Sequence, residues 1–434
     1  MSIDQYFLMI NKLNVVISFF IVAFLYFFIF KKYFISVGDP LLIQLIACIF
    51  STVVVVNLYS MQLISFFYLK NYLISEVCLI IGLVSIKPIN INNIKLPKMK
   101  SSLRNSSFYL IIYILSSTIY VIVQLYIYLK LGIPLFSGKN GSIYGGMGYL
   151  YFLSNINLLV STYFSILYYT TKFYIKKNIC LEIYSYLYTC FVIITLIFSG
   201  SKSSILPIII MYSVFIMYAK KLGININLRK LNTKIFKFLG LGVALFIVIV
   251  VLRDRTSIIK GFSHFFMRLL GYGDVYILGY INNTIDRISN KNVFLYLASS
   301  NISGFLNNIF KLDIERPYAI GIQIVELLTA RNNGFGPNGR YNIFGYIFFG
   351  EYGNYLFSYL LGFLISIVRN KMFYVFSHNY LGGLLYFVFY LNTVICITDI
   401  TTGLTNLFYF VILFVPMMFL SYIVANLLAK SKGQ

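Results

Sequence analysis

The chain has 434 residues, of which 59% are hydrophobic and only 11% charged, and its formal net charge is +23. Soluble domains contain about 25% charged residues, so this composition excludes a soluble globular protein and predicts a polytopic membrane protein. The basic residues lie in short clusters between apolar runs, as lipid-facing anchors do. We therefore do not expect nucleic acid as a partner, despite the positive charge.

A helix needs about 20 mostly apolar residues to cross a membrane core roughly 30 Å thick. The third predicted span is the least typical, because it contains Lys70 and Glu76. The first runs into Lys31 and Lys32 without a small-residue cleavage site, so we expect it to be retained as a helix. Eleven segments are predicted to span, in one integral membrane domain over residues 1–434: residues 14–30, 41–58, 63–86, 108–130, 149–171, 181–199, 204–219, 236–252, 354–368, 374–396 and 405–428.

The distribution of Lys and Arg predicts which ends of these spans face the cytoplasm. Alternate connections carry 20 basic residues on one side and five on the other, and the remaining ten lie in the long segment at 253–353. The richer side is expected to be cytoplasmic. The N-terminus, the loop at 131–148, the turn at 199–204 and the long segment between the eighth and ninth spans are then outside.

Two of the short outer connections contain turn residues. Residues 132–138, Gly-Ile-Pro-Leu-Phe-Ser-Gly, are predicted to form a turn with an apolar centre. Residues 198–204, Phe-Ser-Gly-Ser-Lys-Ser-Ser, lead into the seventh span, where Ser201, Lys202 and free backbone N–H groups are suited to binding an anion. Helix capping explains this second turn equally well.

The long outer segment has features of its own. Apolar residues from Ile258 to Leu270 repeat at helical spacing, which predicts an amphipathic helix in the outer headgroup layer, and Tyr318 to Leu328 is a possible second one. Residues 331–340 are rich in turn formers. Between the two amphipathic segments we expect three asparagines to interrupt any long helix: Asn301, Asn307 and Asn308.

The same segment holds seven of the ten arginines of the chain but only three of its 25 lysines. Lysine elsewhere serves as a point charge at the ends of spans. Arginine keeps its charge and grips phosphate or carboxylate through two parallel hydrogen bonds, so the cluster indicates an anionic ligand. The alternative is a solvated loop whose positive charges balance its seven acidic residues.

In three features, which occur in matching order and topology, the chain resembles the Wzy-type oligosaccharide repeat-unit polymerases, also called O-antigen polymerases. They are the Gly-Ile-Pro-Leu-Phe loop at 132–136, the outer turn Ser-Gly-Ser-Lys at 199–202, and a Gly-Pro turn at 336–337 followed by Phe-Gly-Glu-Tyr-Gly at 349–353. Lys202 stands where the family usually has Arg. An Arg and a Gly separated by ten residues, noted in some members, occur only at Arg268 and Gly279. The resemblance covers about residues 108–370.

The resemblance implies a GT-C-like glycosyltransferase architecture in the bacterial inner membrane, with the active face toward the periplasm. It implies an enzyme of polysaccharide biosynthesis that moves a growing glycan from undecaprenyl diphosphate onto a new lipid-linked repeat unit, without a cofactor. The expected partners are these lipid-linked substrates, membrane lipids and a chain-length regulator protein. The long outer segment contains no Asp-X-Asp, no His pair and no Cys, so we expect no metal site.

Breaking the bond between a sugar C1 and phosphate leaves a diphosphate, so the main chemical task is to stabilise negative charge. Arg253 and Arg255, which follow the eighth span directly, are the first expected contacts of this leaving group. Arg268, Arg287 and Arg331 are interpreted as surface residues. Further diphosphate contacts are expected from four residues: Arg316, Arg340, Lys202 and Ser201.

The base that receives the proton of the acceptor hydroxyl is harder to assign. His264 has a suitable ordinary pKa, although a histidine on an amphipathic helix is more often an interfacial residue. Asp254 lies between two arginines, whose positive charges would make it a poor base. We interpret Asp254 instead as a residue that orients these two arginines. Glu326 and Glu351 remain open as catalytic acids or bases. Asp399 is interpreted as a helix or turn cap.

Two other functions are compatible with these patterns. An O-antigen ligase uses the same donor and passes the finished glycan to the lipid A core; the loop at 132–136 favours the polymerase. A flippase or other transporter of lipid-linked oligosaccharides would keep its charges inside the helical bundle and show related halves. The predicted spans are nearly free of charge, which favours an enzyme over a transporter.

Overall fold

The structure, a computed structural model, is described over residues 3–34, 36–89, 106–137, 148–171, 179–199, 206–219, 267–288, 292–298, 300–312, 318–329, 336–376 and 379–431, and at positions 221, 233, 240, 244, 257 and 314. Within these residues all regular secondary structure is helical. The expected all-α class is therefore confirmed.

Eight helices of the described residues are long and apolar enough to cross a membrane, which confirms a helical polytopic membrane protein. Each contains or overlaps one of the predicted spans. The predicted spans at 204–219 and 374–396 are shorter helices, Leu206–Ala219 (α9) and Tyr380–Ile395 (α18). The span predicted at 236–252 lies almost wholly outside the described residues, so the total of eleven stays a prediction.

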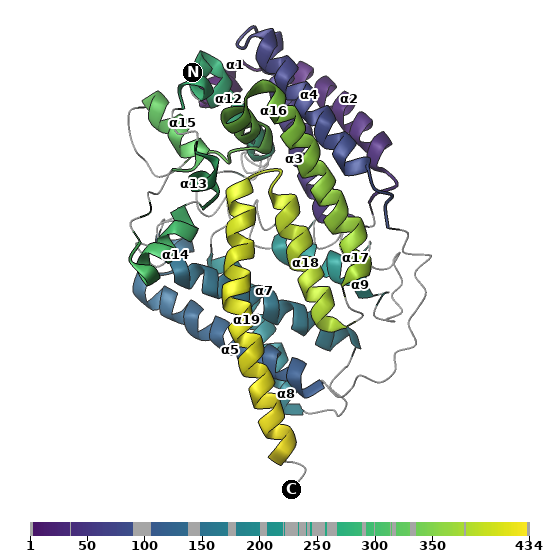
Figure 1. Cartoon of the computed structure of the whole chain (residues 1–434), viewed down its shortest axis with the longest axis vertical. Helices are drawn as coiled ribbons and strands as arrows, with labels where there is room; N and C mark the ends of the chain where they lie inside the picture. Colours follow the sequence, from purple (N-terminus) through teal and green to yellow (C-terminus); the bar gives the residue numbers. More distant parts are fainter. Residues whose placement is uncertain are drawn as a thin grey trace. The chain divides into compact units, whose positions relative to one another are not determined.

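The chain divides into two compact units, coloured along the sequence in Figure 1. Unit 1 comprises Met1–Asn90, Phe262–Phe376 and Val388–Thr405. Unit 2 comprises Ile91–Gly261, Ser377–Phe387 and Asn406–Gln434. The single integral membrane domain and the insertion at 253–353 stay predictions; the described part of that insertion belongs to unit 1 from residue 267 on, whereas Ser257 belongs to unit 2.

The helices of unit 1 come from both halves of the sequence. Before residue 90 they are Ile3–Met9 (α1), Lys12–Phe30 (α2), Pro40–Ser60 (α3) and Phe66–Val84 (α4). After residue 262 they are Gly271–Gly273 (η3), Asp274–Tyr280 (α12), Ile281–Arg287 (η4), Val293–Ala298 (α13), Ser300–Phe310 (α14), Ile320–Thr329 (α15), Tyr341–Ser366 (α16), Ile367–Lys371 (η5) and Met372–Val375 (α17). The last part of α18 and the start of Ile400–Ser431 (α19) complete it.

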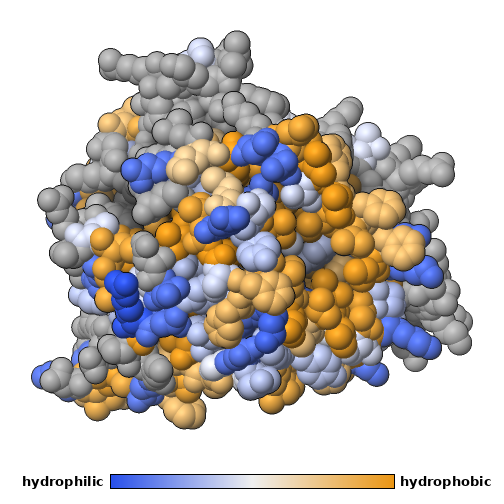
Figure 2. All heavy atoms as spheres, turned by 90° about the horizontal axis from the view of Figure 1, so that it is seen from above, coloured by the Kyte–Doolittle hydropathy of each residue, from blue (hydrophilic) through white to orange (hydrophobic). Residues whose placement is uncertain are grey.

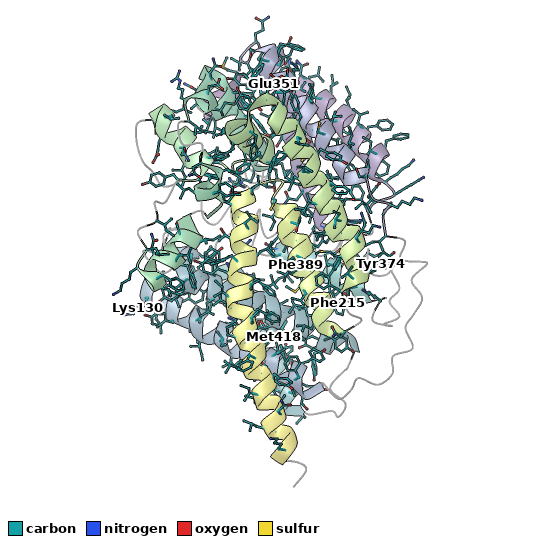
Figure 3. All side chains as sticks on the ribbon, in the orientation of Figure 1. Lys130, Phe215, Glu351, Tyr374, Phe389 and Met418 are labelled. Carbon is teal, nitrogen blue, oxygen red and sulfur yellow. The ribbon has the colours of Figure 1, made fainter. Side chains whose placement is uncertain are left out.

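The closest helix packing in unit 1 is between α4 and α16. A Cβ atom on Gly82 would overlap the carbonyl oxygen of Tyr359, and one on Gly362 would overlap the carbonyl oxygen of Leu79. Small residues let two backbones approach, which is how helices associate in lipid without a hydrophobic driving force between them. Figure 3 labels Glu351 and Tyr374 near the two ends of the long helical segment that runs from α16 into α17.

The helix α16 is bent back on itself at Gly350, whose φ of 72° and ψ of −171° are not helical. The rings of Phe344 and Phe357 are 5.3 Å apart, whereas thirteen residues of straight helix would separate them by about 20 Å. Residues 341–349 therefore form a short limb that folds against the long limb at 351–366. The sequence placed residues 341–353 in the outer loop; in the structure they are helical.

Much of the described part of the long outer segment is also helical. The second expected amphipathic helix, Tyr318 to Leu328, is confirmed as the helix α15. Asn301, Asn307 and Asn308 were expected to interrupt any long helix; the helix here, α14, has only 11 residues, but the asparagines lie inside it and do not break it. The Asn307 side chain donates to and accepts from the backbone of Ile314, which holds the chain after the helix ends. Most of the first expected amphipathic helix lies outside the described residues.

Unit 2 contains Ser106–Leu131 (α5), Pro134–Ser137 (α6), Gly148–Thr171 (α7), Ile179–Phe198 (α8), α9 and the remaining parts of α18 and α19. Tyrosine hydroxyls join its helices: Tyr120 bonds Thr195 at 2.6 Å, and Tyr163 donates to the Tyr380 carbonyl at 2.9 Å. Such interhelical hydrogen bonds help helices to associate in lipid.

Candidate functional site

A tight backbone contact places Arg340 in the interior of unit 1. The Gly336–Pro337 turn lies directly against α15, where a Cβ atom on Gly336 would overlap the backbone of Gly321, and one on Gly321 would overlap the Pro337 carbonyl oxygen. The turn is thus fixed by contacts that only glycine permits. It delivers Arg340 to the N-cap of the short limb of α16, with its backbone oxygen accepting from Phe344 N at 2.9 Å.

The guanidinium of Arg340 is buried and largely without partners. Its side chain is 1% exposed, and Nη2 donates to the Cys48 sulfur at 3.2 Å, a weak acceptor. Among the described residues, Nε and Nη1 have no hydrogen-bond partner. The described residues contain two ion pairs, Lys70–Glu351 and Asp39–Arg369, and neither includes Arg340. A buried arginine with two unsatisfied nitrogens is costly, and such groups are typical of functional sites or of places for an ion or water.

The contact with Cys48 sets the depth of this arginine. Cys48 lies eight residues from the start of α3 and twelve from its end, which corresponds to about 12 Å and 18 Å along the helix axis. Arg340 is therefore near the middle of a membrane-spanning helix and not at its end. The short limb of α16, nine residues long, begins at this depth, so the partial positive charge of its N-terminus adds to that of the guanidinium.

A carboxylate lies near Arg340 without pairing with it. Glu76 on α4 is 4% exposed, and its two oxygens accept from Tyr26 at 2.8 Å and Tyr72 at 3.0 Å. Its charge and that of Arg340 interact, although no ion pair forms. The two groups thus form a buried polar cluster, which we call the Arg340–Glu76 cluster, with the carboxylate satisfied by hydroxyls and the guanidinium left open.

Two further side chains border the Arg340–Glu76 cluster. Tyr276 on α12 donates to Asn342 Oδ1 at 2.7 Å, while Asn342 Nδ2 has no hydrogen-bond partner in the described part of the chain. Burial raises the pKa of the Tyr276 hydroxyl, although the charge of Arg340 acts in the opposite direction. The hydroxyl therefore remains a neutral donor. The open donors of Arg340 and Asn342 together are suited to an anionic oxygen.

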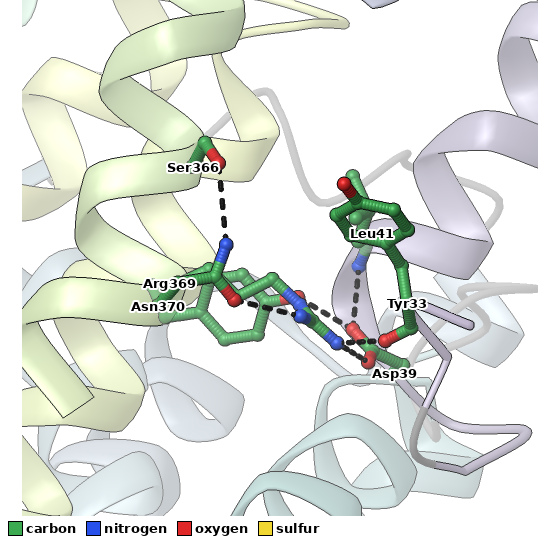
Figure 4. Close-up of polar contacts among 7 residues, drawn as sticks. Tyr33, Asp39, Leu41, Ser366, Arg369 and Asn370 are labelled. Carbon is green, nitrogen blue, oxygen red and sulfur yellow. Dashed lines mark hydrogen bonds and ion pairs between the residues drawn. The ribbon is translucent and has the colours of Figure 1, made fainter. Parts of the chain in front are cut away.

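A second buried arginine, shown in Figure 4, is fully bonded. Arg369 pairs with Asp39 at 2.9 Å, donates through Nε to Tyr390 at 2.9 Å and through Nη1 to Asn370 at 3.0 Å, and also bonds the Tyr33 carbonyl. Arg369 directly follows the predicted span at 354–368 and belongs to the basic residues expected on the cytoplasmic side. Because every guanidinium nitrogen is used, the arrangement is structural.

Most of the expected site residues lie outside the described residues: Arg253, Arg255, His264, Arg316, Ser201 and Lys202. Glu326 is half-buried on α15 and makes no ion pair with a described basic residue. Arg268 and Arg287 are exposed, as expected of surface residues. Arg340 is the one expected diphosphate contact that the described structure places, and it lies beside the middle of α3 and not at the end of that helix.

The sequence interpretation missed the other members of the Arg340–Glu76 cluster. Glu76 was noticed as an acid inside an apolar span, and an ionisable residue in that setting is itself a signal of function. Cys48, Tyr26 and Tyr72 carried no such signal. Their role depends on packing among α2, α3 and α4, which no local pattern contains.

The motif residues of unit 2 are also close together in space. Gly132 has a φ of 80° and ends α5, which is a common helix cap, and the ring of Phe136 lies 6.0 Å from that of Phe198 at the end of α8. The loop at 132–136 therefore contacts the residue that precedes the turn at 199–202.

In the part of the chain with described coordinates, no three His, Cys, Asp or Glu residues are grouped as metal ligands. Comparison with protein-family models, with curated proteins and with solved structures finds no match for the chain.

Proposed function

We propose that this chain is a polysaccharide polymerase of the bacterial inner membrane, which transfers a growing glycan from undecaprenyl diphosphate onto a new lipid-linked repeat unit. The observation that carries the proposal is the open guanidinium of Arg340, set at the N-terminus of a helical limb directly after the Gly336–Pro337 turn. A diphosphate leaving group requires such charge stabilisation, and Arg binds phosphate through paired hydrogen bonds.

In the proposed reaction an acceptor hydroxyl oxygen attacks C1 of the donor sugar, the bond from C1 to the phosphate oxygen breaks, and undecaprenyl diphosphate leaves. Arg340 binds diphosphate oxygens with the nitrogens that lack a protein partner. Arg253 and Arg255 are the proposed further contacts, together with Arg316, Lys202 and Ser201. The order of the three motifs along the chain supports the same assignment.

The decisive experiment is analysis of surface polysaccharide from a strain that lacks this chain. We expect one repeat unit on each lipid A core, because transfer of single units to the core continues without polymerisation. Complete absence of repeats on the core would indicate the ligase instead. Polymer of unchanged length would refute both.

The proposal also requires the active face to be periplasmic. Single cysteines placed near Ser300, on a background without native cysteines, should react with an impermeant thiol reagent in intact cells, while ones near Asn92 should not. The prediction rests on the excess of basic residues on the other side. The opposite labelling pattern would place the arginines of the 253–353 segment on the cytoplasmic side and would contradict a periplasmic active site.

One observation favours a transporter of lipid-linked oligosaccharides as a second function. The predicted spans are nearly free of charge, yet Arg340, Glu76, Asp39 and Arg369 are all buried in unit 1. Buried charges, and a helical limb that begins beside the middle of a long apolar helix, are features of transporters. Lipid-linked repeat units that stay on the cytoplasmic face in sealed membranes of the deletion strain would support transport; units on the periplasmic face would support the polymerase.

A further inference from the structure

An exposed carboxylate in the described part of the long outer segment is held in place by two tyrosines. Tyr68 on α4 donates to Asp286 Oδ2 at 2.6 Å, and Tyr346 on the short limb of α16 donates to Asp286 Oδ1 at 2.9 Å. Asp286 itself lies in η4 and is exposed. Contacts from α4, η4 and the short limb of α16 thus fix the orientation of the Asp286 carboxylate, which remains accessible to a ligand.

The two tyrosines leave the carboxylate with unused capacity. An ionised carboxylate has about four lone-pair sites, and each oxygen of Asp286 uses one for a tyrosine hydroxyl. Tyr68 is buried and cannot rotate freely, because its ring stacks on Tyr280 at 4.7 Å with an interplanar angle of 15°. The remaining sites are therefore presented in a fixed direction, as an acceptor of hydrogen bonds from a hydroxyl requires.

The backbone that carries Asp286 is also unusual. The element η4 is a 3₁₀ helix of seven residues, longer than the three or four usual for this type, and Asn283 within it has a φ of 53°. Asparagine adopts such angles more readily than most residues other than glycine, and here the resulting turn of the backbone holds Asp286 within reach of both tyrosines.

A second carboxylate, that of Glu351, directly follows the bend of α16 at Gly350 and is labelled in Figure 3. Unlike Asp286, it is in an ion pair with another described residue. It pairs with Lys70 at 3.0 Å and accepts from Tyr355 at 2.9 Å. The ion pair leaves it less suited to act as a base, so the sequence candidate at this position is replaced by Asp286, for which the described residues offer no ion pair. Figure 2 shows that hydrophilic residues on the face seen from above form small groups among hydrophobic ones and not one continuous hydrophilic surface.

The short limb of α16 connects the position of Arg340 with the contact that holds Asp286. Tyr346, which donates to Asp286, lies six residues after Arg340 on this limb, about 9 Å along its axis. Arg340, the proposed contact of the leaving group, therefore stands at the start of the limb, and Tyr346, which holds the Asp286 carboxylate, stands toward its other end.

We propose that Asp286, oriented by Tyr68 and Tyr346, is the site for the acceptor sugar hydroxyl and takes its proton during glycan transfer. The inference rests on the proposed polymerase function. The acceptor oxygen forms its bond to C1 with its own electron pair, its proton moves to the Asp286 carboxylate, and the electrons of the broken bond leave with the diphosphate. Tyr68 and Tyr346 are positioning residues.

The test uses membranes of the deletion strain, whose accumulated lipid-linked repeat units are the substrate, with each variant of the full chain supplied in turn. Asp286→Asn should lower the rate of polymer formation by about 100-fold or more, the usual contribution of a base. Tyr68→Phe and Tyr346→Phe should lower it less. Glu351→Gln is the matched control and should stay within about twofold of the wild type, since it removes a carboxylate from the same end that is already paired.

A measurement of proton transfer distinguishes a catalytic role of Asp286 from a purely structural one, in which it would only hold Tyr68 and Tyr346 in place. Asp286→Ala should regain polymerisation when formate is added, because the exposed site admits a small carboxylate that can accept the proton. Normal amounts of protein in the membrane without rescue by formate would overturn the inference, and so would polymerisation by Asp286→Asn at the wild-type rate. If the wild-type chain itself forms no polymer, the proposed function fails and this inference with it.

Discussion

The buried ion pair of Asp39 and Arg369 allows a stability prediction to be worked from the structure. Both side chains are 1% exposed, and Asp39 also caps α3 by accepting from Leu41 N at 3.1 Å. Asp39→Asn keeps the size and the capping ability but removes the charge, so Arg369 becomes a buried cation without a counter-charge. Removing one partner of a buried pair costs about 3–5 kcal/mol. We expect the free energy of unfolding, measured by SDS titration in mixed micelles, to fall by that amount.

Two comparisons isolate the buried charge as the cause. Asp39→Ala should cost about 1 kcal/mol more than Asp39→Asn, because it also removes the helix cap. Glu351→Gln breaks an ion pair whose side chains are 44% and 22% exposed, so it should cost at most about 1 kcal/mol. A loss for Asp39→Asn as small as that for Glu351→Gln would refute the reasoning, since burial would then make no difference to the pair.

Three further predictions test the packing and the expected site. Gly82→Ala introduces a Cβ that overlaps the Tyr359 carbonyl oxygen, so it should lower the free energy of unfolding in the same titration by about 1–3 kcal/mol; unchanged stability would contradict the close crossing of α4 and α16. Arg255→Lys keeps the charge but loses the paired geometry, so gels of surface polysaccharide should show polymer reduced nearly as much as in Arg255→Ala, whereas Arg287→Ala should change little. Polymer of wild-type length in Arg255→Ala would remove that residue from the site. Polymerisation in membranes should survive EDTA; its loss, followed by recovery with added Mg²⁺, would show that a metal supplies the charge stabilisation.

The positions of the spanning helices were predictable because few backbone conformations are stable in lipid. A backbone in lipid must satisfy its own hydrogen bonds, so a long apolar run becomes a helix whatever its other contacts. The predicted span at 14–30 is Leu13–Phe30 in the structure, and that at 41–58 is Pro40–Ser60. The last predicted span, at 405–428, begins five residues earlier, because Thr401, Thr402 and Gly403 join the helix.

The fold-back of α16 could not be read from local sequence. The glycines at 350 and 353 were recognised as part of a family-like motif, but the motif does not say that Gly350 adopts a positive φ. The direction of the short limb is fixed by contacts such as that of Gly345 with Asn354, across the bend. Turn formers just before residue 341 suggested a loop, and the limb between that turn and the bend was assigned to it.

The two buried arginines were likewise beyond sequence patterns, because their partners are distant. Arg369 pairs with a residue 330 positions away, and Arg340 contacts Cys48 across 292 positions. In sequence Arg369 resembles any basic residue at the end of a span. Nothing near Arg340 in the chain distinguishes a surface arginine from one carried to the middle of α3.

The contrast between these arginines is the strongest reason to regard the Arg340–Glu76 cluster as functional. Both side chains are 1% exposed, and burying a guanidinium is costly in either position. At Arg369 four acceptors offset that cost, as in a residue retained for structure. At Arg340 the only acceptor that the described residues offer is a thiol, although Glu76 lies near and bonds tyrosines instead. A protein that needed only stability would do better with an apolar side chain there, so the open guanidinium indicates an anion that binds during function.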